Sequence, residues 1–264
     1  MSNQYLAIDL GGTFIKYGIL TDQGHIVCKA KVETPKDAEI EGLYVVLDQF
    51  IQPLLMDFAV KGIAISAPGA VTDQGTINGI SAISCIHGPN IKEDLQARYG
   101  LPVTIENDAN CAALAEMNTD STKGLQNVLF VVCGTGIGGA VIKDGKLHKG
   151  RNLLAGEFGM LIQYSQAEQS VQSFSWLAST GNMVARASKA LGCPLSGEDV
   201  FVLAESGDSV CQHEVDAFYR HLAVLLTNLQ CVYDPELIVI SGGITERKAF
   251  GKELEDAISK VNQL

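Results

Sequence analysis

A repeated pattern of short strands and glycine turns constrains this chain more than any other feature of its sequence. Residues 5–9 and 128–133 are apolar runs, and each ends in a turn rich in Gly and Thr. Each turn leads into a second run, a turn with Asp and Gly (22–24 and 144–145) and a third run. This order predicts strand, turn, strand, turn and strand, twice. We therefore expect two similar α/β lobes, residues 1–108 and 109–264.

Apolar residues at helical spacing predict helices around these repeats. The predicted helices cover residues 38–58 (with a break near Pro53), 91–99, 109–117, 171–191, 198–204 and 211–233. Further strands are predicted at 60–66, 103–106 and 237–241, and a helix is expected after the last strand. Strands that alternate with helices are typical of an α/β fold.

Composition restricts the class of protein. The chain has 264 residues, 47% of them hydrophobic, which is enough for a sizeable core. A net charge of −11 without a basic run argues against nucleic acid as a partner. The 7 Cys form no CxxC pair, as in a reduced cytoplasmic protein. Only four residues precede Tyr5, so we expect no signal peptide, and no apolar run reaches the roughly 18 residues of a membrane helix.

The first glycine turn carries residue types that bind phosphate. Gly11 and Gly12 have no Cβ, so their backbone N–H groups can approach a phosphate closely, and Thr13 adds a hydroxyl donor. Asp9, at the end of the preceding strand, is placed to hold Mg²⁺ directly or through water, and Lys16 adds positive charge. A plain hairpin would look the same, so this turn alone leaves both interpretations open.

The second turn matches the pattern GxGxxG at Gly134, Gly136 and Gly139. In a dinucleotide-binding fold this pattern opens a helix whose N-terminus holds the pyrophosphate. Here residues 140–145 predict a strand and a hairpin turn, which argues against a nicotinamide dehydrogenase. The Walker pattern GxxxxGK[ST] is absent from the sequence. A hairpin that surrounds phosphate, with Thr135 in its turn, fits better.

Asn107 and Asp108 lie between a predicted strand and a predicted helix. Asp and Asn favour helix caps, and capping is the favoured interpretation of Asp108 taken alone. Its alternative role is that of a general base, which accepts the proton of a sugar hydroxyl as this attacks phosphorus. Asn107 would fix the sugar by hydrogen bonds. The two roles of Asp108 can coexist.

Two further segments carry candidate ligand residues. Glu157 lies between small residues and is placed to accept hydrogen bonds from sugar hydroxyls, although a solvated surface Glu would look the same. Gly242 and Gly243 follow a predicted buried strand, where a flat adenine or ribose can lie against the backbone. A tight turn is the alternative there. The 5 His residues have no metal-ligand spacing.

Taken together, these segments resemble the ROK family of sugar kinases and sugar-responsive repressors. The resemblance runs from about residue 5 to about residue 250. The matching pieces are residues 7–13, 106–110, 134–139, 156–159 and 241–243. No single piece is decisive, but five in this order are specific.

The resemblance implies a duplicated actin/hexokinase-like (ribonuclease H-like) α/β fold, with ATP and sugar in a cleft between two lobes. It implies ATP and Mg²⁺ as cofactors and phosphoryl transfer to a hexose 6-hydroxyl, with Asp108 as the base. By matching position, the sugar would be bound by Asn107, Asp108 and Glu157, with Asn90 and Gly69 as weaker candidates. The phosphates would be surrounded by Gly11, Gly12, Thr13, Gly134, Thr135 and Gly136, and the adenosine by Gly242 and Gly243. Members of the family often form dimers, so the resemblance is consistent with a homodimer but does not fix the oligomeric state.

The chain departs from the family pattern at Met160. Many members have a His there, followed by closely spaced Cys that bind structural zinc. Residues 161–176 contain no Cys, so we predict no zinc site. Losing the His also removes a polar contact near the anomeric end of the sugar. We therefore hypothesise a substrate without a free C1 hydroxyl, such as a β-glucoside, with N-acetylmannosamine as a further candidate.

The other departures concern the two ends. Family repressors carry a helix-turn-helix domain before the first strand, and four residues cannot hold it. Family members usually continue further past 241–243 than Leu264, so we expect a trimmed or shorter C-terminal end.

Two rival functions remain to be compared. A non-catalytic sugar sensor would keep Asn107 and Glu157 but would have no use for Asp9, Thr13 or Asp108. Another phosphotransferase of the same fold, such as an acetate kinase, is disfavoured by residues 106–110 and by Glu157. The sequence therefore predicts an ATP-dependent sugar kinase, without fixing the sugar or the nucleotide.

Overall fold

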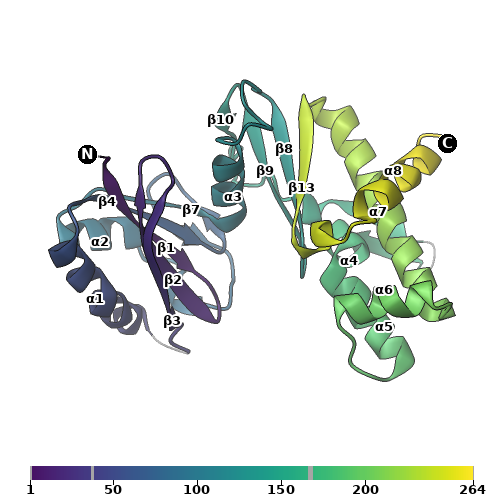
Figure 1. Ribbon diagram of the computed structural model, residues 1–264, viewed down its shortest axis with the longest axis horizontal. Helices are drawn as coiled ribbons and strands as arrows, with labels where there is room; N and C mark the ends of the chain where they lie inside the picture. Colours follow the sequence, from purple (N-terminus) through teal and green to yellow (C-terminus); the bar gives the residue numbers. More distant parts are fainter. Residues whose placement is uncertain (1, 37–38, 166–168, 264) are drawn as a thin grey trace. The chain divides into compact units, whose positions relative to one another are not determined.

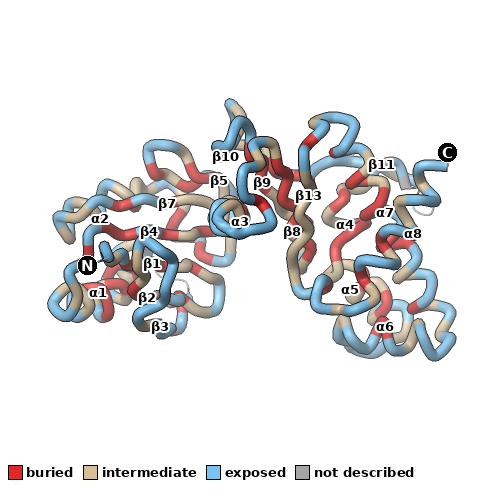
Figure 2. The backbone as a smooth tube through the Cα atoms, turned by 45° about the horizontal axis from the view of Figure 1, so that its top comes forward, coloured by how far each residue is buried: buried red, intermediate tan, exposed pale blue. Residues whose placement is uncertain are grey.

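A computed structural model describes residues 2–36, 39–165 and 169–263. The chain forms two compact units, Met1–Ala112 and Ala113–Leu264, and each is built on one main sheet with helices packed against it (Figures 1 and 2). The functional lobes expected from the sequence, 1–108 and 109–264, remain a prediction. In the described parts of the chain, every helix is too short or too polar to cross a lipid bilayer.

The first unit contains a five-stranded sheet in the order β3-β2-β1-β4-β7. β1 pairs antiparallel with β2 and parallel with β4, and β4 pairs parallel with β7. The elements are β1 (Gln4–Leu10), β2 (Phe14–Thr21), β3 (Ile26–Glu33), α1 (Ile40–Asp57), β4 (Val60–Ala67), β5 (Ala70–Val71), β6 (Ile77–Asn78), the 3₁₀ helix η1 (Ser84–Ile86), α2 (Ile91–Tyr99), β7 (Val103–Asn107) and the start of α3 (Asp108–Glu116).

The core of the first unit lies between its sheet and α1. Alternate residues of β1, such as Leu6 and Ile8, are buried and pack with a buried stripe on α1 that includes Leu47 and Ile51. The expected break of this helix near Pro53 is wrong, because α1 continues through Pro53, which lies on the exposed side of the helix. Burial of the opposite face therefore outweighs the hydrogen bond that Pro removes.

The second unit contains a four-stranded sheet in the order β10-β9-β8-β13, in which β8 pairs parallel with β13. This arrangement repeats that of β3, β2, β1 and β4, as the internal repeat predicts. The elements are β8 (Val128–Cys133), β9 (Ile137–Lys143), β10 (Lys146–Leu147), the 3₁₀ helix η2 (Phe158–Met160), β11 (Ile162–Ser165), β12 (Ser170–Ser173), α4 (Phe174–Ala178), α5 (Thr180–Leu191), α6 (Gly197–Glu205), α7 (Ser209–Tyr233), β13 (Leu237–Ser241), the 3₁₀ helix η3 (Gly243–Glu246) and α8 (Phe250–Val261).

The central strand β8 is buried on both faces. Leu129 and Val131 belong to the large core that includes α7, the long green helix of Figure 1. Val128 and Phe130 pack on the other face with Ala113 of α3. Burial on both sides explains why β8 is a continuous apolar run rather than an alternating one.

The predicted helix at 171–191 is wrong in its first part. Residues 170–173 form β12, and the remainder is two helices that are interrupted at Ser179. Ser173 caps α4 by accepting a hydrogen bond from Trp176 N, and Ser179 caps α5 by accepting one from Asn182 N. Each serine hydroxyl thus starts a new helix where the apolar pattern alone predicts a continuous one.

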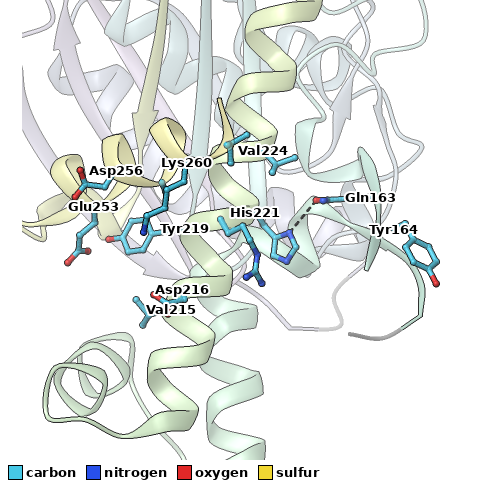
Figure 3. A pocket seen from close by; sticks show the side chains of 13 residues that line it. Gln163, Tyr164, Val215, Asp216, Tyr219, His221, Val224, Glu253, Asp256 and Lys260 are labelled. Atoms are coloured by element: carbon cyan, nitrogen blue, oxygen red, sulfur yellow. Dashed lines mark hydrogen bonds between the residues drawn. The ribbon is translucent and has the colours of Figure 1, made fainter. Parts of the chain in front are cut away.

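A partly buried polar contact joins the β11–β12 hairpin to α7. His221 Nδ1 lies 3.2 Å from Gln163 Oε1, and the pair borders a cavity of about 990 Å³ that is lined by α7, α8 and β11 (Figure 3). Burial, together with the charges of Arg220 and Arg186, lowers the pKa of His221 to about 4. The imidazole is therefore neutral in the folded protein at pH values where an unfolded chain would protonate it.

We predict that the second unit loses stability as the pH falls from about 6.5 to about 4. In this window the unfolded chain binds a proton at His221 and the folded chain does not, so the free energy of unfolding rises with pH. Trp176 is the single Trp of the chain and lies in α4, so its fluorescence in urea titrations follows the second unit. His221→Gln should flatten the pH dependence, whereas His213→Gln, at an exposed position of the same helix, should keep it. Equal slopes for His221→Gln and the unchanged protein would contradict this account.

Candidate active site

Parallel pairing brings the ends of β1, β4 and β7 to one edge of the first sheet. In this register Asp9 lies beside Ser66, and Ser66 lies beside Glu106. Asn107 ends β7, and Asp108 begins α3 directly after it. Ligands of α/β folds bind beyond the carboxyl ends of parallel strands. Three predicted site residues, Asp9, Asn107 and Asp108, therefore belong to the same edge.

Both carboxylate oxygens of Asp9 are hydrogen bonded. Ser66 Oγ donates to Oδ1 at 3.1 Å, and Lys16 Nζ donates to Oδ2 at 3.3 Å. The Asp9 side chain is still 42% exposed, so it can ligate a cation directly or through water, and carboxylate oxygen suits Mg²⁺. The structure thus brings Asp9 and Lys16 together as predicted. Sequence reasoning missed Ser66, whose signal was a hydroxyl near the end of a buried strand.

The first glycine turn links β1 to β2. A Cβ on Gly11 would lie 2.7 Å from the carbonyl oxygen of Phe14, and one on Gly12 would lie 2.8 Å from Ala82 Cβ. Glycine is therefore the residue that fits both positions without a shift of the backbone. Gly12 and Thr13 are exposed, so a phosphate in solution can reach this turn.

Asn107 supplies the main cap of α3, one residue before the position expected from the sequence. Its Oδ1 accepts hydrogen bonds from Ala109 N at 2.9 Å and from Asn110 N at 3.2 Å. Asp108 is exposed, and its Oδ1 accepts from Ala109 N at 2.8 Å. Because Asn107 satisfies the first donors of the helix, the start of α3 does not depend on the Asp108 carboxylate.

Gly69 and Asn90 contribute to the structure around this edge. Gly69 has a φ of +106°, and its carbonyl oxygen accepts a hydrogen bond from Asn107 Nδ2 at 3.1 Å. Asn90 Oδ1 accepts from Glu93 N at 3.2 Å and caps α2. Gly69 thus fixes the Asn107 amide, while the contact of Gly69 and Asn90 with a sugar stays a prediction.

The second glycine turn links β8 to β9. The strand Ile137–Lys143 follows the turn directly, so the GxGxxG pattern does not open a helix. Gly134 N donates to the carbonyl oxygen of Gly136 at 2.9 Å, which closes the turn. A Cβ on Gly136 would lie 2.7 Å from Ser175 Oγ. Thr135, between the two glycines, is exposed.

Parallel pairing of β13 with β8 places Gly242 against the start of the second turn. Ser241 lies beside Val132 in the register, and Gly242 has a φ of +114°. A Cβ on Gly242 would lie 2.0 Å from the carbonyl oxygen of Cys133, so this approach requires glycine. Two segments that are predicted to bind nucleotide therefore lie at the same edge of the second sheet, residues 134–136 and 242–243.

Glu157 precedes η2 and is exposed. It lines a cavity of about 700 Å³ with mostly apolar neighbours such as Leu154 and Leu161. Met160 N donates to the carbonyl oxygen of Glu157 at 3.0 Å, and Met160 is 63% exposed. Glu157, which is predicted to bind the sugar, and Met160, where the chain departs from the family pattern, are therefore one short turn apart.

Cys111 lies near the first site edge, with its Sγ 3.8 Å from the carbonyl oxygen of Glu106. Burial, and next the negative charge of Glu106, raise the pKa of its thiol to about 11. The thiolate is the reactive form of cysteine, and the raised pKa of Cys111 disfavours it at neutral pH.

No zinc site is apparent in the part of the chain that the structure describes, where no three His, Cys, Asp or Glu side chains form a metal-binding group. The prediction of no zinc rests on residues 161–176, and 166–168 lie outside the described residues. It therefore stays a prediction.

Comparison with known proteins places this architecture in a family. The model of the ROK family matches residues 5–263. The Beta-glucoside kinase of Listeria monocytogenes serovar 1/2a is 37% identical over 259 residues, which cover 94% of this chain and 85% of that protein.

Two solved structures are also similar to the chain. A ROK family protein from Streptococcus pneumoniae TIGR4 in complex with sucrose is 39% identical, with a TM-score of 0.88 and coverage of 98% of this chain and 86% of that one. A ROK family glucokinase from Streptomyces griseus in complex with glucose and AMPPNP is 27% identical, with a TM-score of 0.73 and coverage of 98% and 88%. The chain belongs to the ROK family and has the actin/hexokinase-like α/β fold that its sequence predicts.

Proposed function

We propose that this chain is an ATP-dependent sugar kinase that phosphorylates the 6-hydroxyl of a hexose unit. The observation that carries the proposal is the edge of the first sheet, where Asp9, Asn107 and the exposed Asp108 accompany a glycine turn of the phosphate-binding type. Relatives named as kinases and a neighbour with bound glucose and AMPPNP support it.

In the proposed mechanism Asp108 accepts the proton of the attacking hydroxyl. Asn107, whose amide is fixed by Gly69 and by the first turn of α3, orients the sugar, and Glu157 binds its other hydroxyls. The turns at residues 11–13 and 134–136 surround the phosphates, with the N–H groups of Gly12 and Thr135 as donors, and Lys16 offsets the phosphate charge. Gly242 and Gly243 hold the adenosine. Asp9 would hold Mg²⁺, which would offset phosphate charge. Most of the catalysis is positioning and electrostatics, because phosphoryl transfer needs little covalent help from the protein.

The specific substrate that we propose is a β-glucoside. The Met160 side chain is a thioether, which has no hydrogen-bond donor and only a weak acceptor, and it lies one turn from Glu157. A site without a donor near C1 does not penalise a substituted C1 oxygen, whereas a site built to bond a free hydroxyl would. The name of the Listeria relative supports this choice. The sucrose in the Streptococcus neighbour is an α-glucoside, so it supports a substituted C1 oxygen but not the β anomer.

We also propose a cytoplasmic location and a homodimer. The seven cysteines, all within the described residues, are free thiols, which supports a reducing compartment. The dimer is supported only by the fact that members of the family often form dimers. Residues 1–108 and 109–264 would be the two lobes of each subunit.

Asp108→Asn should lower kcat by about 10²–10⁴-fold, because a carboxamide cannot accept the hydroxyl proton. The dissociation constant of the sugar should stay within about threefold, because the cap supplied by Asn107 and the shape of the site are kept. Steady-state kinetics with sugar titrations measure both. Asp57→Asn, an exposed Asp at the end of α1, is the matched control and should keep full turnover. A kcat for Asp108→Asn close to that of the control would remove Asp108 from the mechanism.

A panel of glucose, N-acetylmannosamine, cellobiose and methyl β-glucoside, assayed by ADP formation, should show the highest kcat/KM for a β-glucoside. The margin over glucose should be at least about tenfold, which is the discrimination that one contact in a pocket supplies. Met160→His should narrow this margin, and Met56→His, at an exposed position of α1, should not. A clear preference of the unchanged protein for free glucose would contradict the proposal that the substrate is a β-glucoside.

A further inference from the structure

In each unit, a threonine outside the glycine turn holds the carbonyl group of the turn's first glycine. Thr34 Oγ1 donates to the carbonyl oxygen of Gly11 at 2.6 Å, and Thr180 Oγ1 donates to that of Gly134 at 2.8 Å. Gly11 directly follows β1, and Gly134 directly follows β8. The two contacts therefore occupy equivalent places in the two halves of the repeat.

Such a bond sets the direction of the next backbone N–H group. In a planar trans peptide the C=O and the following N–H point in opposite directions. The N–H of Gly12 therefore points away from Thr34, and the N–H of Thr135 points away from Thr180. Thr34 is only 7% exposed, while Gly12 and Thr135 are exposed. Each threonine thus turns one N–H donor toward the accessible side of its turn.

Further contacts hold the second turn in the same way. Gly181 N, in the first turn of α5, also donates to the carbonyl oxygen of Gly134, at 3.0 Å. Asn182 Nδ2 lies 3.5 Å from the carbonyl oxygen of Thr135, which directs the N–H of the next residue outward as well. A Cβ on Gly181 would lie 2.7 Å from Thr135 Cα, so the start of α5 fits closely against the turn.

The first turn has its own second contact. Thr34 N donates to the carbonyl oxygen of Thr13 at 3.0 Å, so Thr34 holds two carbonyl groups of the turn at once. Successive N–H groups that point to one side form a concave donor set for anionic oxygen. The carbonyl groups of Gly11 and Thr13 in the first turn, and those of Gly134 and Thr135 in the second, would repel phosphate and are bonded to protein donors.

We propose that Thr34 and Thr180 are positioning residues for the nucleotide phosphates. They act through the carbonyl groups of Gly11 and Gly134 and do not contact the ligand themselves. The inference rests on the proposed kinase function, because it takes nucleotide phosphate as the ligand of each turn. If the two threonines had a merely structural role, replacing them would lower the melting temperature and leave the affinity for nucleotide unchanged.

The test compares Thr180→Val, which removes the hydroxyl, with Thr180→Ser, which keeps it. Calorimetric titration of the whole chain with Mg²⁺–AMPPNP should give a dissociation constant about fivefold to tenfold higher for Thr180→Val, the effect of one lost hydrogen bond. Thr180→Ser should stay within about twofold of the unchanged protein. The pair Thr34→Val and Thr34→Ser should behave alike. In kinetics, the KM for ATP should rise for the Val variants while the KM for sugar stays constant.

Thr227→Val is the matched control. Thr227 lies in α7 of the second unit, and its buried hydroxyl has no hydrogen-bond partner among the described residues. This variant should bind AMPPNP as the unchanged protein does. Unaltered AMPPNP binding in both Val variants, or equal loss in the Val and Ser variants, would overturn the proposal.

The outcome is separable from that of the proposed function. If no sugar is phosphorylated but the Val and Ser variants still differ in AMPPNP binding, the kinase assignment fails and the positioning role stands. If the unchanged protein does not bind AMPPNP, both fail.

Discussion

Both halves of this protein depend on one constraint, which is the parallel pairing of a central strand with a strand from later in the chain. In the first unit it sets Asp9 beside Ser66 and brings Asn107 to the same edge. In the second it sets Gly242 against Cys133, where the second glycine turn begins. A slip of one residue would turn every side chain to the opposite face of the sheet. The buried apolar residues that fix the register therefore also fix the chemistry.

The two halves support their turns by the same bond in different surroundings. Thr34 follows the last strand of a three-strand meander, whereas Thr180 begins a helix. Both donate to the first glycine after a central strand, Gly11 or Gly134. Elements of different type thus meet one requirement, which is to direct backbone N–H groups outward. What the duplication preserves is the direction of these donors rather than the segment that supplies the bond.

Local patterns predicted most of the helices and strands because strand and helix periods are short, whereas the actin/hexokinase-like fold was implied by the resemblance to a family. The strand Leu237–Ser241 and the helix that begins after Asn90 follow directly from apolar runs and a capping residue. The split of the helix at Ser179 was missed, because an apolar pattern continues across a capping serine. Ser66 and Thr180 were missed because their partners lie 57 and 46 residues away in the sequence. Such contacts depend on strand order, which no local pattern contains.

Identification of the reaction product tests the central claim most directly. The intact protein is incubated with Mg²⁺–ATP and cellobiose, and ³¹P and ¹³C NMR locate the new phosphate. The account predicts a phosphate ester at C6 of one glucose unit, formed in equal amount with ADP and with the glycosidic bond intact. Release of ADP and free phosphate without a phosphorylated sugar, or an ester at C1, would contradict it.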